Sequence, residues 1–284
     1  MNIQQNPFSV YDFLGYLIPG AISLYLILFF VGFDPADEAA IESAIKFVLS
    51  LMSFEHPEIY VPFILLSYSV GHFLSFLSTI TVERYSIWAY GYPSKYLLDV
   101  SREKKDYFEG NEWVIRSAIL FIVAPITLFD LIICDKLLNK KGYFYAQPLD
   151  EFLVTRLRYR INKLVGRNFH DGGDKNRFNA SDSDFFRYVY HYAVENAGNH
   201  LPKMQNYVAL YGFLRALTLI SSLTFWGILY FVCFTVNAFS IIGSILIVVL
   251  AAIITYFLFV SFVKFYRRYT LEALMAMAVT YRLD

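Results

Sequence analysis

Cysteine is nearly absent from this chain, which has two in 284 residues. Cys134 and Cys233 both lie in or beside apolar segments, and neither has a neighbouring Cys or His at a metal-binding or redox spacing. These absences exclude a zinc site or a redox motif of the usual pattern. We expect both cysteines to act as small apolar side chains.

Catalytic motifs are missing as well. The chain has no glycine-rich phosphate loop, no nucleophile elbow and no HExxH sequence. The acids and histidine between His170 and Asp184 match neither an EF-hand loop nor a paired-histidine motif, which favours a solvated polar loop. We therefore expect no enzyme activity, no cofactor and no metal.

Positive charge is absent from the first twelve residues, and no small-x-small cleavage site follows the first apolar run. A cleavable signal peptide is therefore not expected. The formal net charge is zero, but the charges are separated along the chain. The loop from Asp34 to Glu58 has six acids and one lysine, whereas Asp135 to Tyr207 carries twelve of the 24 Lys and Arg residues.

Apolar residues are what the chain has in excess. They make up 57% of it, aromatic residues 19%, and the mean hydropathy is +0.46, values typical of a membrane protein. We predict an all-α integral membrane protein with four transmembrane helices, one re-entrant or interfacial segment and a small helical cytosolic module. The predicted spans are residues 13–33, 59–82, 216–236 and 241–263.

The second predicted span contains an unusual polar stripe. Tyr68, His72, Ser75 and Thr79 follow a helical spacing, so we expect this face to point into protein rather than lipid. Gly71 and Ser75 form a small-xxx-small pair that permits close helix approach. His72 is the only histidine in a clear span, and an intramembrane ionisable group is a candidate for a proton or ion path. The alternative is a neutral histidine hydrogen-bonded to another helix.

The third apolar segment, residues 117–134, is short and has Pro125 at its centre and Asp130 near its end. If it crosses the membrane, six Lys and Arg lie outside and seventeen inside. If it re-enters, one lies outside and twenty-two inside, with Arg215 set aside at the interface. The positive-inside rule favours a re-entrant hairpin bent at Pro125, with both termini cytosolic. Irregular backbone at membrane depth must be covered by other helices or by water, so we expect this hairpin to pack against the bundle or an oligomer axis.

These features divide the chain into four regions. Residues 1–134 form the N-terminal membrane region, 135–207 the basic cytosolic module, 208–263 a transmembrane hairpin and 264–284 an amphipathic tail helix. The tail stripe is expected to pack against the module or a second copy of the chain. Its residues are Leu271, Leu274, Met275, Ala278 and Val279.

The cytosolic module is predicted to begin with a basic amphipathic helix capped by Asp150. Its apolar stripe runs from Leu149 to Leu164, and its cations lie off that stripe: Arg156, Arg158, Arg160 and Lys163. The helix either rests on anionic lipid headgroups or packs into a small helical domain. A second helix is predicted to open with a capping box at Ser181 and Asp184 and to run through Asn196. Its inward residues are Phe185, Phe186, Val189, Tyr190 and Ala193.

One stretch resembles a known group of proteins. The fifteen residues from Asn6 to Gly20, NPFSVYDFLGYLIPG, are similar to the start of uncharacterised bacterial inner-membrane proteins, some of them associated with anti-phage defence. The resemblance contains no catalytic motif and transfers no functional residue. It implies a membrane effector or sensor.

The first hypothesis for function is a homo-oligomeric protein of the bacterial inner membrane that alters membrane permeability or relays a signal from its module. His72 would line an interior path, Asp130 would pair with a cation or with Arg116, and Arg215 would couple the module to the fourth segment.

The second hypothesis is a scaffold that recruits a cytosolic protein partner through its basic module, and a lipid-directed enzyme is third. Basic residues beside aromatics are also typical of nucleic-acid or nucleotide-messenger binding, but an amphipathic helix is the favoured explanation.

Overall fold

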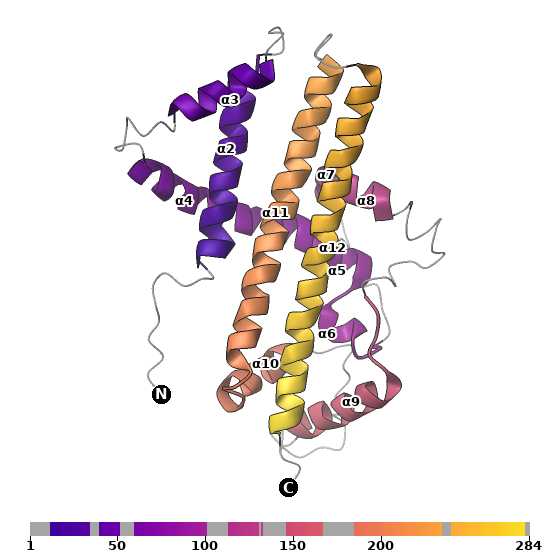
Figure 1. Ribbon diagram of the computed structural model, residues 1–284. Coiled ribbons are helices and arrows are strands. Elements are labelled where there is room, and N and C mark those ends of the chain that lie inside the picture. The colour runs from indigo at the N-terminus through magenta and orange to yellow at the C-terminus, as the bar shows by residue number, and fades with distance from the viewer. Residues whose placement is uncertain are drawn as a thin grey trace.

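The computed structural model describes residues 12–34, 40–51, 60–100, 113–130, 132, 146–166, 185–234 and 240–281. Within these residues the regular elements are all helices, and no strand is present (Figure 1). Four helices are long and apolar enough to cross a membrane, and a fifth element is a bent helix pair. The predicted fold class is confirmed.

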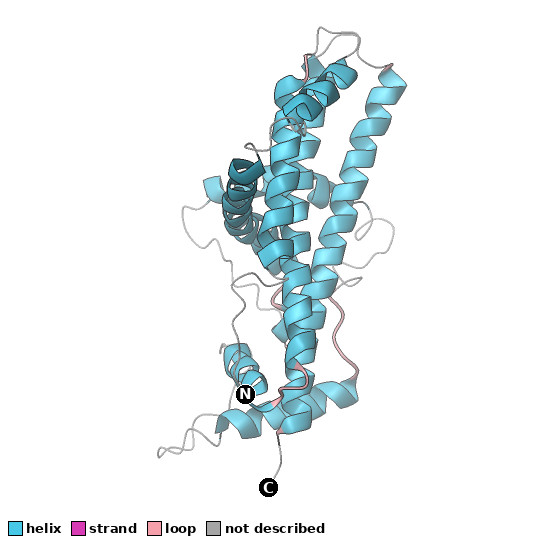
Figure 2. Cartoon of the chain, turned by 60° about the vertical axis from the view of Figure 1, so that its left-hand side comes forward, coloured by secondary structure: helices cyan, strands magenta, loops and turns pink. Residues whose placement is uncertain are grey.

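A long antiparallel hairpin forms the centre of the molecule. It consists of α11 (Leu201–Phe234) and α12 (Ile241–Thr280), each without a break. At about 1.5 Å per residue, α12 is about 60 Å long, twice the thickness of a hydrocarbon core. Both helices therefore continue well beyond the predicted spans, and Figure 2 shows the hairpin extending into the helices packed at its lower end.

The N-terminal helix begins with a π-helical turn, η1 (Phe13–Leu17), and continues as α2 (Ile18–Gly32). The predicted short amphipathic helix is α3 (Ala40–Leu51), which packs on α2. Figure 1 places α3 at the same end of the molecule as the connected ends of α11 and α12. The C-terminal end of α12 and the module lie at the other end.

The second apolar segment differs from an ordinary upright span. It forms α4 (Tyr60–Ser78), a π-helical turn η3 (Thr79–Glu83) and α5 (Arg84–Tyr90), and α4 crosses behind α2 and α11 at a steep angle (Figure 1). The crossing requires glycine on both helices. A Cβ on Gly20 would lie 1.7 Å from the Ser67 carbonyl oxygen, and one on Gly71 would lie 1.9 Å from that of Tyr16.

The third segment is bent, as predicted. Helices α7 (Trp113–Ile122) and α8 (Ala124–Asp130) meet at 81°, with Val123 at the break and Pro125 in the first turn of α8. The chain on either side of the pair comes together, because the Leu149 amide donates to the Leu97 carbonyl at 3.1 Å. The bend is confirmed, and re-entry on one side of the membrane stays a prediction.

The module consists of α9 (Glu151–Gly166) and α10 (Phe185–Asn196), packed against the lower part of α12. The Asp150 side chain accepts a hydrogen bond from the Leu153 amide at 3.0 Å, so the predicted cap is confirmed. The stripe of α9 is buried in the main core with α10 and α12: Leu157, Ile161, Leu164, Phe185, Val189, Leu274 and Met277. Of the two alternatives for α9, packing into a helical domain is therefore the correct one.

The C-terminal tail and the start of α10 differ in how far the structure tests their predictions. The tail is a continuation of α12 rather than a separate helix, so its orientation follows the packing of the whole helix. Its buried face contains Ala273, Leu274, Ala276 and Met277, whereas Val279 is 67% exposed, so the predicted stripe was partly wrong. The predicted capping box at residues 181–184 lies outside the described residues, as does the polar loop at 170–184.

Candidate functional site

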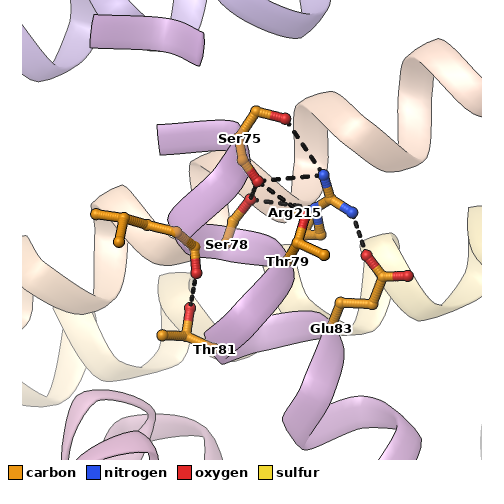
Figure 3. A network of polar contacts seen from close by, with 7 residues as sticks. Ser75, Ser78, Thr79, Thr81, Glu83 and Arg215 are labelled. Atoms are coloured by element: carbon orange, nitrogen blue, oxygen red, sulfur yellow. Dashed lines mark hydrogen bonds and ion pairs between the residues drawn. The ribbon is translucent and has the colours of Figure 1, made fainter. Parts of the chain in front are cut away.

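The most unusual group in the core is the guanidinium of Arg215, halfway along α11. The residue is only 8% exposed and forms an ion pair with Glu83 of η3 (Figure 3). Its Nε donates to Ser78 Oγ at 3.1 Å, and Nη2 donates to Ser75 Oγ at 3.3 Å. Burying a charge is costly unless it is paired and hydrogen-bonded, and this site meets both conditions.

The position of the pair along the hairpin follows from contacts on either side of it. Ser221 and Thr255 are hydrogen-bonded at 2.8 Å, and the rings of Tyr211 and Tyr266 stack at 5.1 Å. Arg215 therefore lies opposite the last apolar turns of α12, before Lys264. The sequence placed Arg215 at the membrane interface. In the structure its guanidinium is buried against η3 and α4, where Glu83 and two serines bind it.

A second polar cluster joins α5 to the bent pair. The carboxylate of Asp130 accepts hydrogen bonds from the hydroxyls of Tyr85, at 3.2 Å, and Tyr90. The guanidinium of Arg116 lies 4.1 Å from the ring centroid of Trp88, a cation–π contact. Helix α5 thus holds both ends of the bent pair through its aromatic side chains. The predicted pairing of Asp130 with Arg116 stays a prediction.

The break in the bent pair leaves backbone carbonyls without their helical donors. Pro125 has no N–H for the Phe121 carbonyl, and the Ile126 amide donates to Val123 instead of Ile122. Helix α11 supplies both missing donors. Trp226 Nε1 donates to the Phe121 carbonyl at 3.0 Å, and Ser222 Oγ donates to the Ile122 carbonyl. This is the shelter that irregular backbone at membrane depth requires.

His72 is separate from these clusters. Its ring stacks on Tyr16 at 3.8 Å and meets Tyr68 edge-on at 4.6 Å, yet the residue is exposed in the single chain. Within one chain the stripe is therefore only partly covered, and the expectation that all of it faces protein stays a prediction. Because α4 crosses the bundle steeply, only a short part of the stripe is covered: Ser75 reaches Arg215, while His72 and Thr79 face outward.

The four cations of α9 do not form a single free surface. Arg158 donates to the carbonyls of Leu98 and Asp99, the latter at 2.8 Å, and Arg160 donates to that of Tyr281 at 3.2 Å. These two side chains tie α9 to the flank of the bent pair and to the C-terminal end of α12.

The other two cations lie along α9 itself, over aromatic side chains of the same helix. Arg156 lies 5.4 Å from the Phe152 ring centroid and Lys163 lies 5.2 Å from that of Tyr159.

The base of the hairpin is held by a charged group that sequence reasoning missed. Glu272 of α12 binds His200 Nδ1 at 2.9 Å and Lys203 Nζ at 2.7 Å, both at the start of α11. Burial raises the pKa of the Glu272 carboxyl, but the hydrogen bonds and charges of Lys203 and His200 outweigh it and lower the pKa below its usual value. The carboxylate is therefore ionised at neutral pH.

Glu83 was also missed, although the sequence contains its signal: it follows Thr79 by four residues and so continues the polar stripe. The roles of Tyr85, Tyr90, Ser222 and Trp226 have no such signal, because they depend on how the helices meet. In the described part of the chain, no three His, Cys, Asp or Glu side chains gather as metal ligands.

Comparison with protein-family models, with curated proteins and with solved structures gave no match.

Proposed function

We propose that the protein is a bacterial inner-membrane effector or sensor in which the cytosolic module controls membrane permeability through the bent pair α7–α8. One observation carries the proposal: Ser222 and Trp226 hold the break of that pair, and both belong to a helix that runs unbroken to the module. Bent, irregular backbone of this kind is tolerated at membrane depth where it lines water or packs on protein.

A continuous series of contacts connects the module to the bent pair. Helices α9 and α10 pack on α12, and Glu272 fixes α12 to the start of α11. Over its 34 residues α11 then contacts η3 through Arg215 and the bent pair through Ser222 and Trp226. A displacement of the module would therefore move the groups that hold the bent pair in place.

The remaining parts of the proposal come from charge, exposure and resemblance. The distribution of Lys and Arg favours cytosolic termini. The exposed intramembrane ring of His72 favours a homo-oligomer, since a polar group facing lipid is costly and a second chain would cover it. The resemblance at residues 6–20 is the ground for a role in anti-phage defence.

The test is leakage of ions or a small dye across the inner membrane of bacteria expressing the protein at matched levels. We expect leakage from the wild type to change in a Ser222→Ala/Trp226→Phe double variant, and to depend on His72 in a His72→Ala variant. Gly212→Ala is the control, since it lies on the same helix with no heavy atom within 4 Å of an added Cβ.

Equal leakage in wild type, control and uninduced cells would contradict the proposal. The function would then be that of a membrane anchor for a cytosolic partner, and affinity capture through the exposed residues of α9 would be the next experiment.

A further inference from the structure

Between α4 and α5, the π-helical turn η3 interrupts what would otherwise be a continuous α-helix. The Arg84 amide donates to the Thr79 carbonyl, five residues earlier, so the turn holds one residue more than an α-turn. Single π-turns inside α-helices occur frequently at functional sites. The extra residue rotates the end of η3 and all of α5 relative to α4, and in this register Glu83 lies against Arg215.

Helix α5 is short and has a joint at each end. It spans seven residues and is followed by Gly91, whose φ of +82° is in the region that favours glycine. No heavy atom lies within 4 Å of a Cβ added to Gly91, so the backbone there has open space. Beyond the joint, Arg158 and the Leu149 amide hold the chain at residues 97–99. These two joints are the places where the backbone would absorb a rotation of α5.

Closing η3 to an ordinary α-turn would move each residue of α5 into the place now occupied by the next residue, a step of about 100° and 1.5 Å. Val82 would take the place of Glu83 beside Arg215. Arg84 would take the place of Tyr85, where it would face the carboxylate of Asp130. Ser75 and Ser78 precede the turn and would remain as partners of Arg215.

We propose that η3 and α5 form a register switch that exchanges the Arg215–Glu83 ion pair for an Arg84–Asp130 ion pair. The number of ion pairs is the same in both registers, and a signal that binds one register more tightly would select it. The switch changes the contact with α11 and the contact with the bent pair in a single step. That it controls permeability rests on the function proposed above.

The register can be read by thiol crosslinking with a short bifunctional methanethiosulfonate reagent in the full-length protein in lipid nanodiscs, with Cys134 and Cys233 replaced by Ala. A cysteine pair at positions 88 and 116 reports the observed register, because the side chains at these positions face each other, with the Arg116 guanidinium 4.1 Å from the Trp88 ring centroid, and the reagent spans the space that the two long side chains fill. A pair at 87 and 116 reports the shifted register, in which Ile87 occupies the place of Trp88. The measured quantity is the ratio of the two crosslinking yields.

In the wild-type background we expect the 88–116 crosslink to dominate. Glu83→Gln removes the charge that holds the observed register, so the ratio of 87–116 to 88–116 crosslinks should rise about tenfold or more. Adding Asp130→Asn should reverse that rise, because the shifted register loses its own ion pair. Glu151→Gln, an exposed carboxylate on α9, should leave the ratio at its wild-type value.

Deleting Ile80 gives the decisive control. This residue is 38% exposed and lies within η3, so its removal closes the π-turn while α5 keeps its observed orientation. Combined with Glu83→Gln, the deletion should restore the 88–116 crosslink. A ratio that does not respond to Glu83→Gln, or that responds and is not restored by the deletion, overturns the register switch.

Crosslinking and leakage separate the two proposals. If the crosslinking ratio shifts while leakage stays constant, the switch holds and the proposed control of permeability is wrong. If leakage responds to Ser222 and Trp226 while the ratio never shifts, the function holds and the switch is wrong.

Discussion

The hairpin α11–α12 and the region from η3 to α8 belong to the same bundle but are stabilised in different ways. The hairpin helices run for 34 and 40 residues, so nearly all their backbone groups are paired within the helix. The other region contains a π-turn, a glycine with positive φ and a break at Pro125.

The groups that stabilise the irregular region come from the hairpin. Arg215, Ser222 and Trp226 all lie on α11, and each binds a group of η3 or of the bent pair. The regular part of the molecule thus defines the shape of the irregular part. Variants that break these contacts should therefore affect the irregular region first.

The largest loss of stability is expected when the buried ion pair is broken. Arg215→Met leaves the Glu83 carboxylate without its cation and should lower the free energy of unfolding by about 3 kcal/mol or more. Thermal unfolding in detergent measures the change. The double variant Arg215→Met/Glu83→Leu should recover most of the loss, because no unpaired charge remains. A double variant that is as unstable as the single one would show that the pair matters for packing rather than charge.

The glycine crossing between η1 and α4 ranks second. Gly71→Leu would bring side-chain atoms against the Tyr16 backbone, and overpacking of this kind costs about 1–3 kcal/mol. Gly212→Ala on α11 is the matched control and should instead stabilise the protein by about 0.5–1 kcal/mol, since alanine favours the helix and meets no neighbour. Equal effects at both positions would contradict the close approach at Gly71.

A smaller effect is expected where α11 supports the bent pair. Trp226→Phe keeps an aromatic ring stacked on Phe121 but removes the donor to the Phe121 carbonyl, at a cost of about 1 kcal/mol. Hydrogen exchange should report faster opening of α8 while α12 stays protected. Faster exchange throughout the hairpin would mean that the two regions do not open separately.

The smallest expected effect is the pH dependence of stability that comes from Glu272. The pKa of Glu272 is lower in the folded protein, so its carboxylate stabilises the fold above its unfolded value of about 4.5, and this contribution is lost as the pH falls through the folded value. The difference in unfolding temperature between wild type and Glu272→Gln should be clear at pH 7 and disappear in acid. Glu42→Gln, which breaks the exposed pair with Lys46, should cause no shift at any pH.

The sequence predicted those parts of the fold that follow from local chemistry. Length and apolar character identified the spans, Pro125 indicated the bend, and Asp150 indicated the start of α9. The steep crossing of α4 was not predicted, because a polar stripe indicates a preferred partner but says nothing of the angle at which a helix crosses its neighbours.

For the candidate site, the sequence identified which polar residues are unusual but not which ones meet. Arg215 and Asp130 were selected because they are polar residues at or near membrane depth, and both lie in buried or half-buried clusters. Their partners, Glu83 and Tyr90, are distant in the chain, and the π-turn that aligns them has no sequence signature. Only the packing of η3 and α5 between the hairpin and the bent pair brings them together.

In the proposed topology the hairpin crosses the membrane, whereas the bent pair enters and leaves on the cytosolic side. Single cysteines at positions 100 and 147, on either flank of the bent pair, and at exposed position 50 on α3 test it in intact cells and inverted membrane vesicles. If the bent pair re-enters, a membrane-impermeant maleimide will label positions 100 and 147 only in inverted vesicles, and position 50 only in intact cells. Labelling of positions 100 and 147 from opposite sides would contradict it.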